Sequence, residues 1–285
     1  MKRSDMSYQG YDCMAIAVDG GVATVVIDHP PINLFDSALM VEMNRLCKEL
    51  RDDEAVRVMV FRSANSDFFI AHADVELIRR LPAQPEAKPT ELGFFYGIVE
   101  GFRTMPKVSI GQIEGRAGGG GSEFLISLDM RFAAVGRAIL SQPEVALGII
   151  PGGGATQRLP RLMGRGRALE AILGARDFDA REAERTGWVN RALPADEIGP
   201  FVDGLARRIA SFPSETIALA KEAVAAAEPC PVQGLLEESH CFQRSLATRG
   251  AVERMARFLE IGGQTVEGER RLQDLIDAMA TPPGS

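Results

Sequence analysis

The chain has 285 residues, of which 46% are hydrophobic and 25% charged, and its formal net charge is -7. This length and apolar content are sufficient for one large α/β domain, or for such a domain with a helical appendage. The acidic balance argues against a nucleic-acid-binding surface, and no run approaches the ~18 apolar residues that a membrane span requires. We therefore expect a globular protein that binds neither nucleic acid nor membrane.

The N-terminal segment and the cysteines bear on the cellular compartment. Residues 1–12 contain basic residues but lack the apolar stretch of a secretory signal, and we interpret them as a short leader that need not be ordered. The four cysteines form no C-x-x-C pair, and the three histidines are scattered. This pattern is typical of reduced thiols and offers no zinc site. The sequence thus predicts a cytoplasmic protein without a metal centre.

The first elements in chain order are a hairpin and a helix. Residues 14–28 predict two short strands around Gly20-Gly21, because paired glycines between β-branched runs favour a hairpin turn. After a proline-containing loop, Asp36 or Ser37 can cap a helix. The apolar face of this helix repeats every three or four residues and consists of Leu39, Met43, Leu46 and Leu50.

Strands and helices then alternate up to about residue 195. The alternation indicates an α/β core, and its segments are a strand over 56–63, a proline-rich loop over 82–89, a helix over 92–103, a strand over 107–115, a loop–helix–strand unit over 117–134 and a loop–helix unit over 139–164. From about residue 200 the apolar spacing is helical throughout. We therefore divide the chain into the leader, a core over 13–199 and a helical C-terminal subdomain over 200–285.

A run of four glycines, 118–121, stands directly before Ser122 and Glu123. Consecutive glycines are costly in conformational entropy and are tolerated where backbone must approach another group closely. Because an apolar helical run follows, free N–H groups at the helix N-terminus can face an anion or a carbonyl oxygen. Taken alone, the motif is equally consistent with a structural glycine loop and a capping glutamate. It lacks the G-K-[ST] ending of a P-loop and the G-x-G-x-x-G spacing of a dinucleotide site.

A second motif combines an acid with another glycine run. The segment Ser141-Gln142-Pro143-Glu144 is followed at 151–154 by Pro-Gly-Gly-Gly, which again opens a helix. Together, EGRAGGGGSEF and QPEVALGIIPGGGATQRLPRLMG closely resemble the crotonase superfamily of enoyl-CoA hydratases and isomerases. The resemblance covers about 14–285 and is strongest at 115–162. Either glycine run alone would be far less specific.

The resemblance implies a fold, a substrate class and an assembly. The expected fold is an α/β, crotonase-like spiral of β-β-α units with a helical C-terminal region, which assembles as a homotrimer or a dimer of trimers. The expected substrate is an acyl-CoA thioester, and no separate cofactor is implied because coenzyme A is part of that substrate.

The resemblance also assigns catalytic roles by position. Glu123 and Glu144 match the paired glutamates that hold the attacking water in hydratases, and Gly152 matches a backbone N–H that helps to position it. The backbone N–H groups of Ala73 and Gly120 match the two donors that stabilise the enolate oxygen. Two nearby carboxylic acids should titrate as a pair, so we expect a bell-shaped pH–rate profile.

The loop Ala71-His72-Ala73-Asp74 matches the segment against which the CoA adenine packs, and Ala71, Ala73 and Asp74 are its predicted contacts. Relatives often carry glycine where this chain has His72. We interpret His72 as a packed residue that braces the loop, with a catalytic role as the less favoured alternative.

Several functions compete with hydration. The presence of both acids favours a hydratase over a Δ3,Δ2-enoyl-CoA isomerase, the runner-up, or another enolate chemistry on the same scaffold. A non-catalytic RNA-binding or scaffold relative is disfavoured by the acidic charge and the two glutamates. A serine hydrolase using Ser122 with His72 is disfavoured because the G-x-S-x-G elbow is absent.

Overall fold

The computed structural model describes residues 8–227 and 231–280. It begins with the predicted hairpin, in which β1 (Met14–Asp19) and β2 (Val22–Ile27) pair antiparallel. Gly20 and Gly21 form the turn with positive φ of 61° and 84°, a conformation that glycine adopts without steric cost. The described part of the predicted leader, residues 8–12, lies against the next helix, and residues 1–7 lie outside the described residues.

Two sheets form the core. The larger has the order β1-β2-β3-β5-β7-β10 and is parallel beyond β2; its remaining strands are β3 (Val58–Ser63), β5 (Val108–Ile113), β7 (Met130–Ala134) and β10 (Arg191–Leu193). The smaller sheet has the order β4-β6-β8-β9 and contains β4 (Phe68–Ile70), β6 (Arg116–Gly118), β8 (Ile139–Ser141) and β9 (Phe178–Asp179).

The chain alternates between these sheets as it advances. Each of β3, β5 and β7 in the large sheet is followed by β4, β6 or β8 in the small one, and helical segments then lead back. This alternation is the predicted spiral of β-β-α units. The short second strands were not predictable from the sequence, because three residues are too few to show a period.

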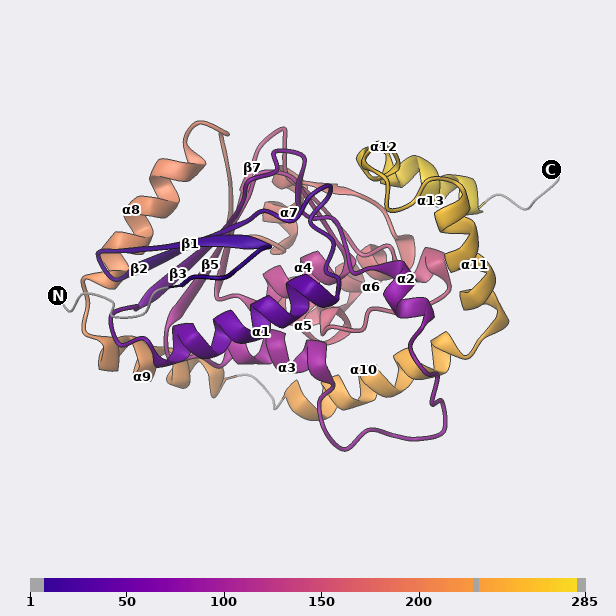
Figure 1. The fold of residues 1–285 in the computed structure, drawn as a ribbon, viewed down its shortest axis with the longest axis horizontal. Helices are drawn as coiled ribbons and strands as arrows, with labels where there is room; N and C mark the ends of the chain where they lie inside the picture. The colour runs from indigo at the N-terminus through magenta and orange to yellow at the C-terminus, as the bar shows by residue number, and fades with distance from the viewer. Residues whose placement is uncertain (1–7, 228–230, 281–285) are drawn as a thin grey trace.

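Helices cover both faces of the large sheet (Figure 1). On one face, α1 (Ser37–Asp52) and α3 (Phe94–Arg103) pack into the main core, and Asp36 caps α1 as predicted by accepting a hydrogen bond from the Leu39 N–H. The predicted face of α1, from Leu39 to Leu50, is fully buried. On the other face, α8 (Ile198–Ala210) covers the outward-pointing valines of β3, because successive side chains of a strand alternate between faces.

The predicted C-terminal helical region is also present. It continues from α8 with α9 (Ser214–Ala225), α10 (Pro231–Leu246), α11 (Arg249–Glu260), α12 (Val266–Arg270) and α13 (Leu272–Ala280). In Figure 1, α10 to α13 form an arm at the end of the molecule away from β1 and α8. No helix within 8–227 and 231–280 has the length and apolar character needed to cross a membrane.

Shorter helical segments connect the core strands. They are α2 (Val75–Arg79), a 3-10 turn (Glu144–Leu147), α5 (Ala155–Met163), α6 (Arg165–Gly174) and α7 (Ala180–Thr186). The proline-rich segment 82–89 lies in the loop between α2 and α3, as predicted. These connections bring α2, the 3-10 turn and the N-terminus of α5 to the side of the core that faces α10 and α11.

Candidate active site

The four glycines allow the helix α4 (Gly119–Ser127) to begin in direct contact with the segment that follows β4. All nine residues of α4 are buried. A Cβ on Gly121 would collide with the carbonyl oxygen of Ile70, and one on Gly120 would lie 3.3 Å from the Ala73 nitrogen. The run is therefore required by close backbone approach, which brings the N-terminus of α4 beside residue 73.

This packing brings the two predicted oxyanion donors together. Phe35 accepts a hydrogen bond from the Asp74 N–H and donates one to the His72 carbonyl, in a parallel bridge opposite Ala73. Because alternate amides of an extended segment face opposite sides, the Ala73 N–H points away from Phe35. Gly120 lies in the first turn of its helix, where N–H groups lack intrahelical partners. Both amides can therefore be directed at one oxygen atom.

A cavity of about 490 Å³ opens at this point. All five residues with predicted roles in the chemistry contribute to its wall, and these are Ala73, Gly120, Glu123, Glu144 and Gly152. The rest of the wall is mainly apolar and comes from distant parts of the chain, including Met40, Leu77, Ile78, Phe95, Phe242 and Phe258. The site thus combines a few polar groups with an apolar chamber, as is common for small-molecule sites.

Of the three predicted CoA contacts, two line the cavity and one is buried behind it. Ala73 and Asp74 line the cavity, whereas Ala71 is fully buried behind it. Both backbone groups of Ala71 bond within the core, to the Ile32 carbonyl and the Gly118 N–H. The Asp74 side chain caps α2 and also accepts a hydrogen bond from Gln264.

Glu123 is held by the start of α5. Its Oε1 accepts hydrogen bonds from the N–H groups of Gly153, at 2.7 Å, and Ala155, at 3.0 Å. Burial and the negative charge of Glu238 raise the pKa of Glu123 to about 8, although these two N–H groups and Arg158 oppose the shift. Glu123 therefore retains its proton near neutral pH.

Glu144 begins the 3-10 turn after β8 and reaches the same chamber. A Cβ on Gly119 would lie 2.7 Å from its Oε1, so the first residue of α4 must be glycine for this carboxyl to approach. Gln142, with its amide nitrogen turned to the carboxyl, donates to both Glu144 oxygens at 3.1 Å and accepts from Ser122. Burial, then the charges of Glu123 and Glu238, raise the pKa of Glu144 well above its usual range.

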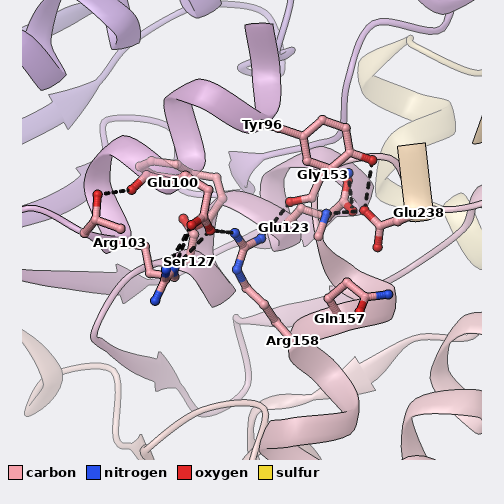
Figure 2. Close-up of polar contacts among 12 residues, drawn as sticks. Tyr96, Glu100, Arg103, Glu123, Ser127, Gly153, Gln157, Arg158 and Glu238 are labelled. Carbon is pink, nitrogen blue, oxygen red and sulfur yellow. Dashed lines mark hydrogen bonds and ion pairs between the residues drawn. The ribbon is translucent and has the colours of Figure 1, made fainter. Parts of the chain in front are cut away.

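Charged residues that were not predicted from the sequence surround the Glu123 turn (Figure 2). Glu238 of α10 accepts hydrogen bonds from Gly154 and Thr156, and Arg158 donates to the Gly153 carbonyl at 2.8 Å while it pairs with Glu100.

The spacing of α10 contained a signal for this cluster. Glu238 lies three residues after Leu235 and four before Phe242, on the apolar stripe of its helix. A charged residue in a buried stripe is unusual unless it is paired. Arg158 is a second such residue, three positions after Ala155 and next to Leu159 on the buried side of α5.

His72 has the bracing position that we expected. Its Nδ1 contacts the Ala73 carbonyl at 2.7 Å, and its Nε2 contacts Glu269 of α12 at 3.0 Å. Ser122 instead accepts a hydrogen bond from Trp188. The two residues of the serine-hydrolase alternative thus face different partners. Within the described ranges, no group of three or more His, Cys, Asp or Glu side chains could hold a metal ion.

Comparisons with known proteins agree with this arrangement. The family model for enoyl-CoA hydratase/isomerase matches residues 17–268. A crotonyl-CoA hydratase of Syntrophomonas wolfei is 32% identical over 253 residues, which is 88% of this chain and 96% of the relative. A short-chain-enoyl-CoA hydratase of Clostridium acetobutylicum is 32% identical over 244 residues, covering 85% and 92%.

A solved structure supports the same assignment. The crystal structure of a Streptomyces avermitilis protein that carries the enoyl-CoA hydratase name superposes with a TM-score of 0.88 at 39% identity. The match covers 95% of this chain and 99% of that one. The two-sheet spiral agrees with these matches. The chain therefore belongs to the enoyl-CoA hydratase/isomerase family, the crotonase superfamily.

Proposed function

We propose that the protein is an enoyl-CoA hydratase, which adds water across the α,β double bond of an acyl-CoA thioester. The observation that carries the proposal is the convergence of Glu123, Glu144, Ala73 and Gly120 on one apolar-walled cavity. The names of the relatives from Syntrophomonas and Clostridium agree with this activity. The family supplies the acyl-CoA substrate class, and the cavity provides an apolar chamber for the acyl chain.

The chemistry follows from the placement of these groups. Water attacks Cβ, and the electron pair of the double bond moves through Cα toward the thioester oxygen, where the amides of Ala73 and Gly120 stabilise the developing charge. One such donor is typically worth ~2.7–4 kcal/mol of barrier. The carboxyl pair takes one proton from the water and delivers one to Cα. The pair therefore needs one protonated and one ionised member, and the raised pKa values of Glu123 and Glu144 permit that state near neutral pH.

The decisive experiment compares hydration and isomerisation. Purified protein should consume crotonyl-CoA, measured as loss of enoyl absorbance, faster than it converts a 3-enoyl-CoA. Glu123→Gln and Glu144→Gln should each lower kcat for hydration by about 10²–10⁴. Glu237→Gln is the matched control, because Glu237 is an exposed neighbour of Glu238 that pairs with Lys88. Faster turnover of the 3-enoyl substrate would replace hydration by isomerisation, and no turnover of either would favour a non-catalytic role.

A further inference from the structure

A third carboxylate, that of Glu238, is buried behind the wall of the site. It comes from α10 in the C-terminal region, and only 2% of the residue is exposed. Figure 2 shows Glu238 in one cluster with Tyr96, Gly153 and Glu123. A buried carboxylate costs free energy unless its hydrogen bonds are satisfied, so its partners indicate what it does there.

Four donors converge on Glu238. Oε1 accepts hydrogen bonds from the Gly154 N–H at 2.6 Å and the Tyr96 hydroxyl at 3.0 Å. Oε2 accepts from the Thr156 N–H at 2.8 Å and from the Thr156 hydroxyl. Glu123 takes the two intervening amides, those of Gly153 and Ala155. Four successive N–H groups at the start of α5 thus alternate between two buried carboxyl groups.

The unequal number of donors decides where the negative charge resides. An ionised carboxylate only accepts hydrogen bonds, and hydrogen bonds to the charged form favour ionisation. Burial raises the pKa of Glu238 too, and the hydrogen bonds from Thr156, Tyr96 and Gly154 oppose that shift. Glu238 has four donors and Glu123 has two, so of the two carboxyl groups Glu238 better stabilises the charge and Glu123 keeps the proton.

The other titratable groups that face Glu123 and Glu238 do not neutralise the charge on Glu238. Burial and Glu238 raise the pKa of Tyr96, which stays neutral. Arg158 is engaged with Glu100 and the Gly153 carbonyl. Glu144 faces Glu123 from the opposite element and adds negative charge when it ionises. The net effect of Glu238 on Glu123 is therefore repulsion between like charges.

We propose that Glu238 is a positioning residue that keeps one proton on the Glu123–Glu144 pair at neutral pH and fixes the glycine turn to which Glu123 bonds. The proposal rests on the hydratase function only for its kinetic consequence. It explains why a charged acid occupies the apolar stripe of α10, where a neutral glutamine could also accept hydrogen bonds.

Glu238→Gln tests the proposal because it keeps the size of the side chain and removes the charge. Both limbs of the kcat/KM profile against pH should move to lower pH, by about one pH unit or more, since each proton then leaves the pair more easily. Glu238→Asp, which retains the charge, should leave the limbs near those of the unchanged protein. Glu237→Gln on the same helix should not move them at all. Reduced activity with unmoved limbs in Glu238→Gln would overturn the proposal.

Infrared titration of the buried carboxyl groups gives a readout that does not require turnover. The carboxyl band that disappears in Glu123→Gln identifies Glu123, and its midpoint should fall to lower pH in Glu238→Gln. This result would stand even if no enoyl-CoA proved to be a substrate, so failure of the hydratase proposal and failure of this one are distinguishable. An unchanged midpoint would refute the inference.

Circular dichroism establishes that each variant is folded. If Glu238→Gln does not fold, Thr156→Val carries the test, because it removes one hydroxyl donor and keeps every backbone donor. The ionised form of Glu238 would then be less stabilised. The titration midpoint of Glu123 should again move to lower pH, by a smaller amount than in Glu238→Gln. A midpoint that stays in place would count against the proposal.

Discussion

At the scale of single residues, Glu123 combines a proposed catalytic role with an unfavourable electrostatic environment. Its folded-state pKa of about 8 lies above the ordinary value of 4.5, so the folded protein binds this proton more tightly than the unfolded chain does. Stability is therefore lost as the pH rises from about 4.5 through about 8.

Glu123→Gln should accordingly be more stable than the unchanged protein at alkaline pH, even though it is less active. The glutamine oxygen can still accept from Gly153 and Ala155, and no charge forms near Glu238. We expect an advantage in the free energy of unfolding that grows with pH and exceeds about 1 kcal/mol by pH 8.5. Urea unfolding at pH 6 and pH 8.5 measures it. Two parallel stability curves would show that Glu123 ionises normally.

The pH dependence of catalysis follows from the same residues. Because repulsion between Glu123 and Glu144 makes the second proton of the pair harder to lose than the first, we expect a range of pH in which the pair holds one proton. We expect a bell-shaped kcat/KM profile with its alkaline limb near pH 8. Initial rates with crotonyl-CoA between pH 5 and 9 test this expectation. A flat profile, with chemistry shown to limit the rate, would argue against a paired-acid mechanism.

At the scale of elements, α12 braces the loop that carries Ala73, a proposed oxyanion donor. His72 has an acceptor at each ring nitrogen, the Ala73 carbonyl and Glu269, which favours the imidazolium form. Burial acts to lower the pKa of His72, but the charge of Glu269 outweighs it and raises the pKa. The pKa of Glu269 is lowered: burial opposes ionisation, but the charge of His72 and the hydrogen bonds outweigh it.

Glu269→Gln should therefore destabilise the protein in a pH-dependent way. The ionised Glu269 makes its full contribution to stability above about pH 4.5. The His72 imidazolium makes its full contribution below about pH 6.5, and this contribution is lost as the pH rises through the raised pKa of His72 in the folded protein. We expect the free energy of unfolding to fall by about 3–5 kcal/mol between these two pH values, as when one partner of a buried pair is removed. The decrease should be smaller at pH 9. Denaturant unfolding at pH 5.5 and pH 9 measures both.

The matched control is Glu253→Gln, which removes an exposed i,i+4 pair with Arg249 on α11 and should change nothing measurable. If Glu269→Gln cost the same at both pH values, His72 would be neutral throughout. In that case the bracing would come from hydrogen bonding alone.

Elements with a clear period were predictable and those without one were not. The α1 face from Leu39 to Leu50 follows the helical period, and the hairpin follows from Gly20-Gly21. The strands β4, β6 and β8 have three residues each and owe their conformation to pairing with one another. Glu238 escaped prediction because its partners, the amides of α5, lie more than 80 positions away along the chain, although its place on an apolar stripe was visible.

At the scale of the whole molecule, the assembly remains a prediction from the family resemblance. Exposed apolar side chains occur on α9, where Leu219 is 64% and Val224 is 71% exposed. Such residues are candidates for burial between subunits. Sedimentation equilibrium should give about three or six times the chain mass of 30.8 kDa. A monomer at micromolar concentration would contradict the expected trimer or dimer of trimers.

The cavity also joins the two parts of the molecule, because its walls come from both. Leu77 and Ile78 belong to α2 in the core, whereas Phe242 and Phe258 belong to α10 and α11. An acyl chain in this chamber would bury apolar surface against both sets of side chains. Binding should then make the C-terminal helices and the core unfold together.

Butyryl-CoA, a saturated ligand that cannot be hydrated, allows this coupling to be measured. At 100 times its Kd it should stabilise the protein by about 2.7 kcal/mol and slow hydrogen exchange in α10 and α11 together with α2. Free coenzyme A at equal saturation is the control: it lacks the acyl chain, so it should leave α10 and α11 unprotected. Protection of α2 alone by butyryl-CoA would place the acyl chain outside the chamber, and the C-terminal arm would then have no part in substrate selection.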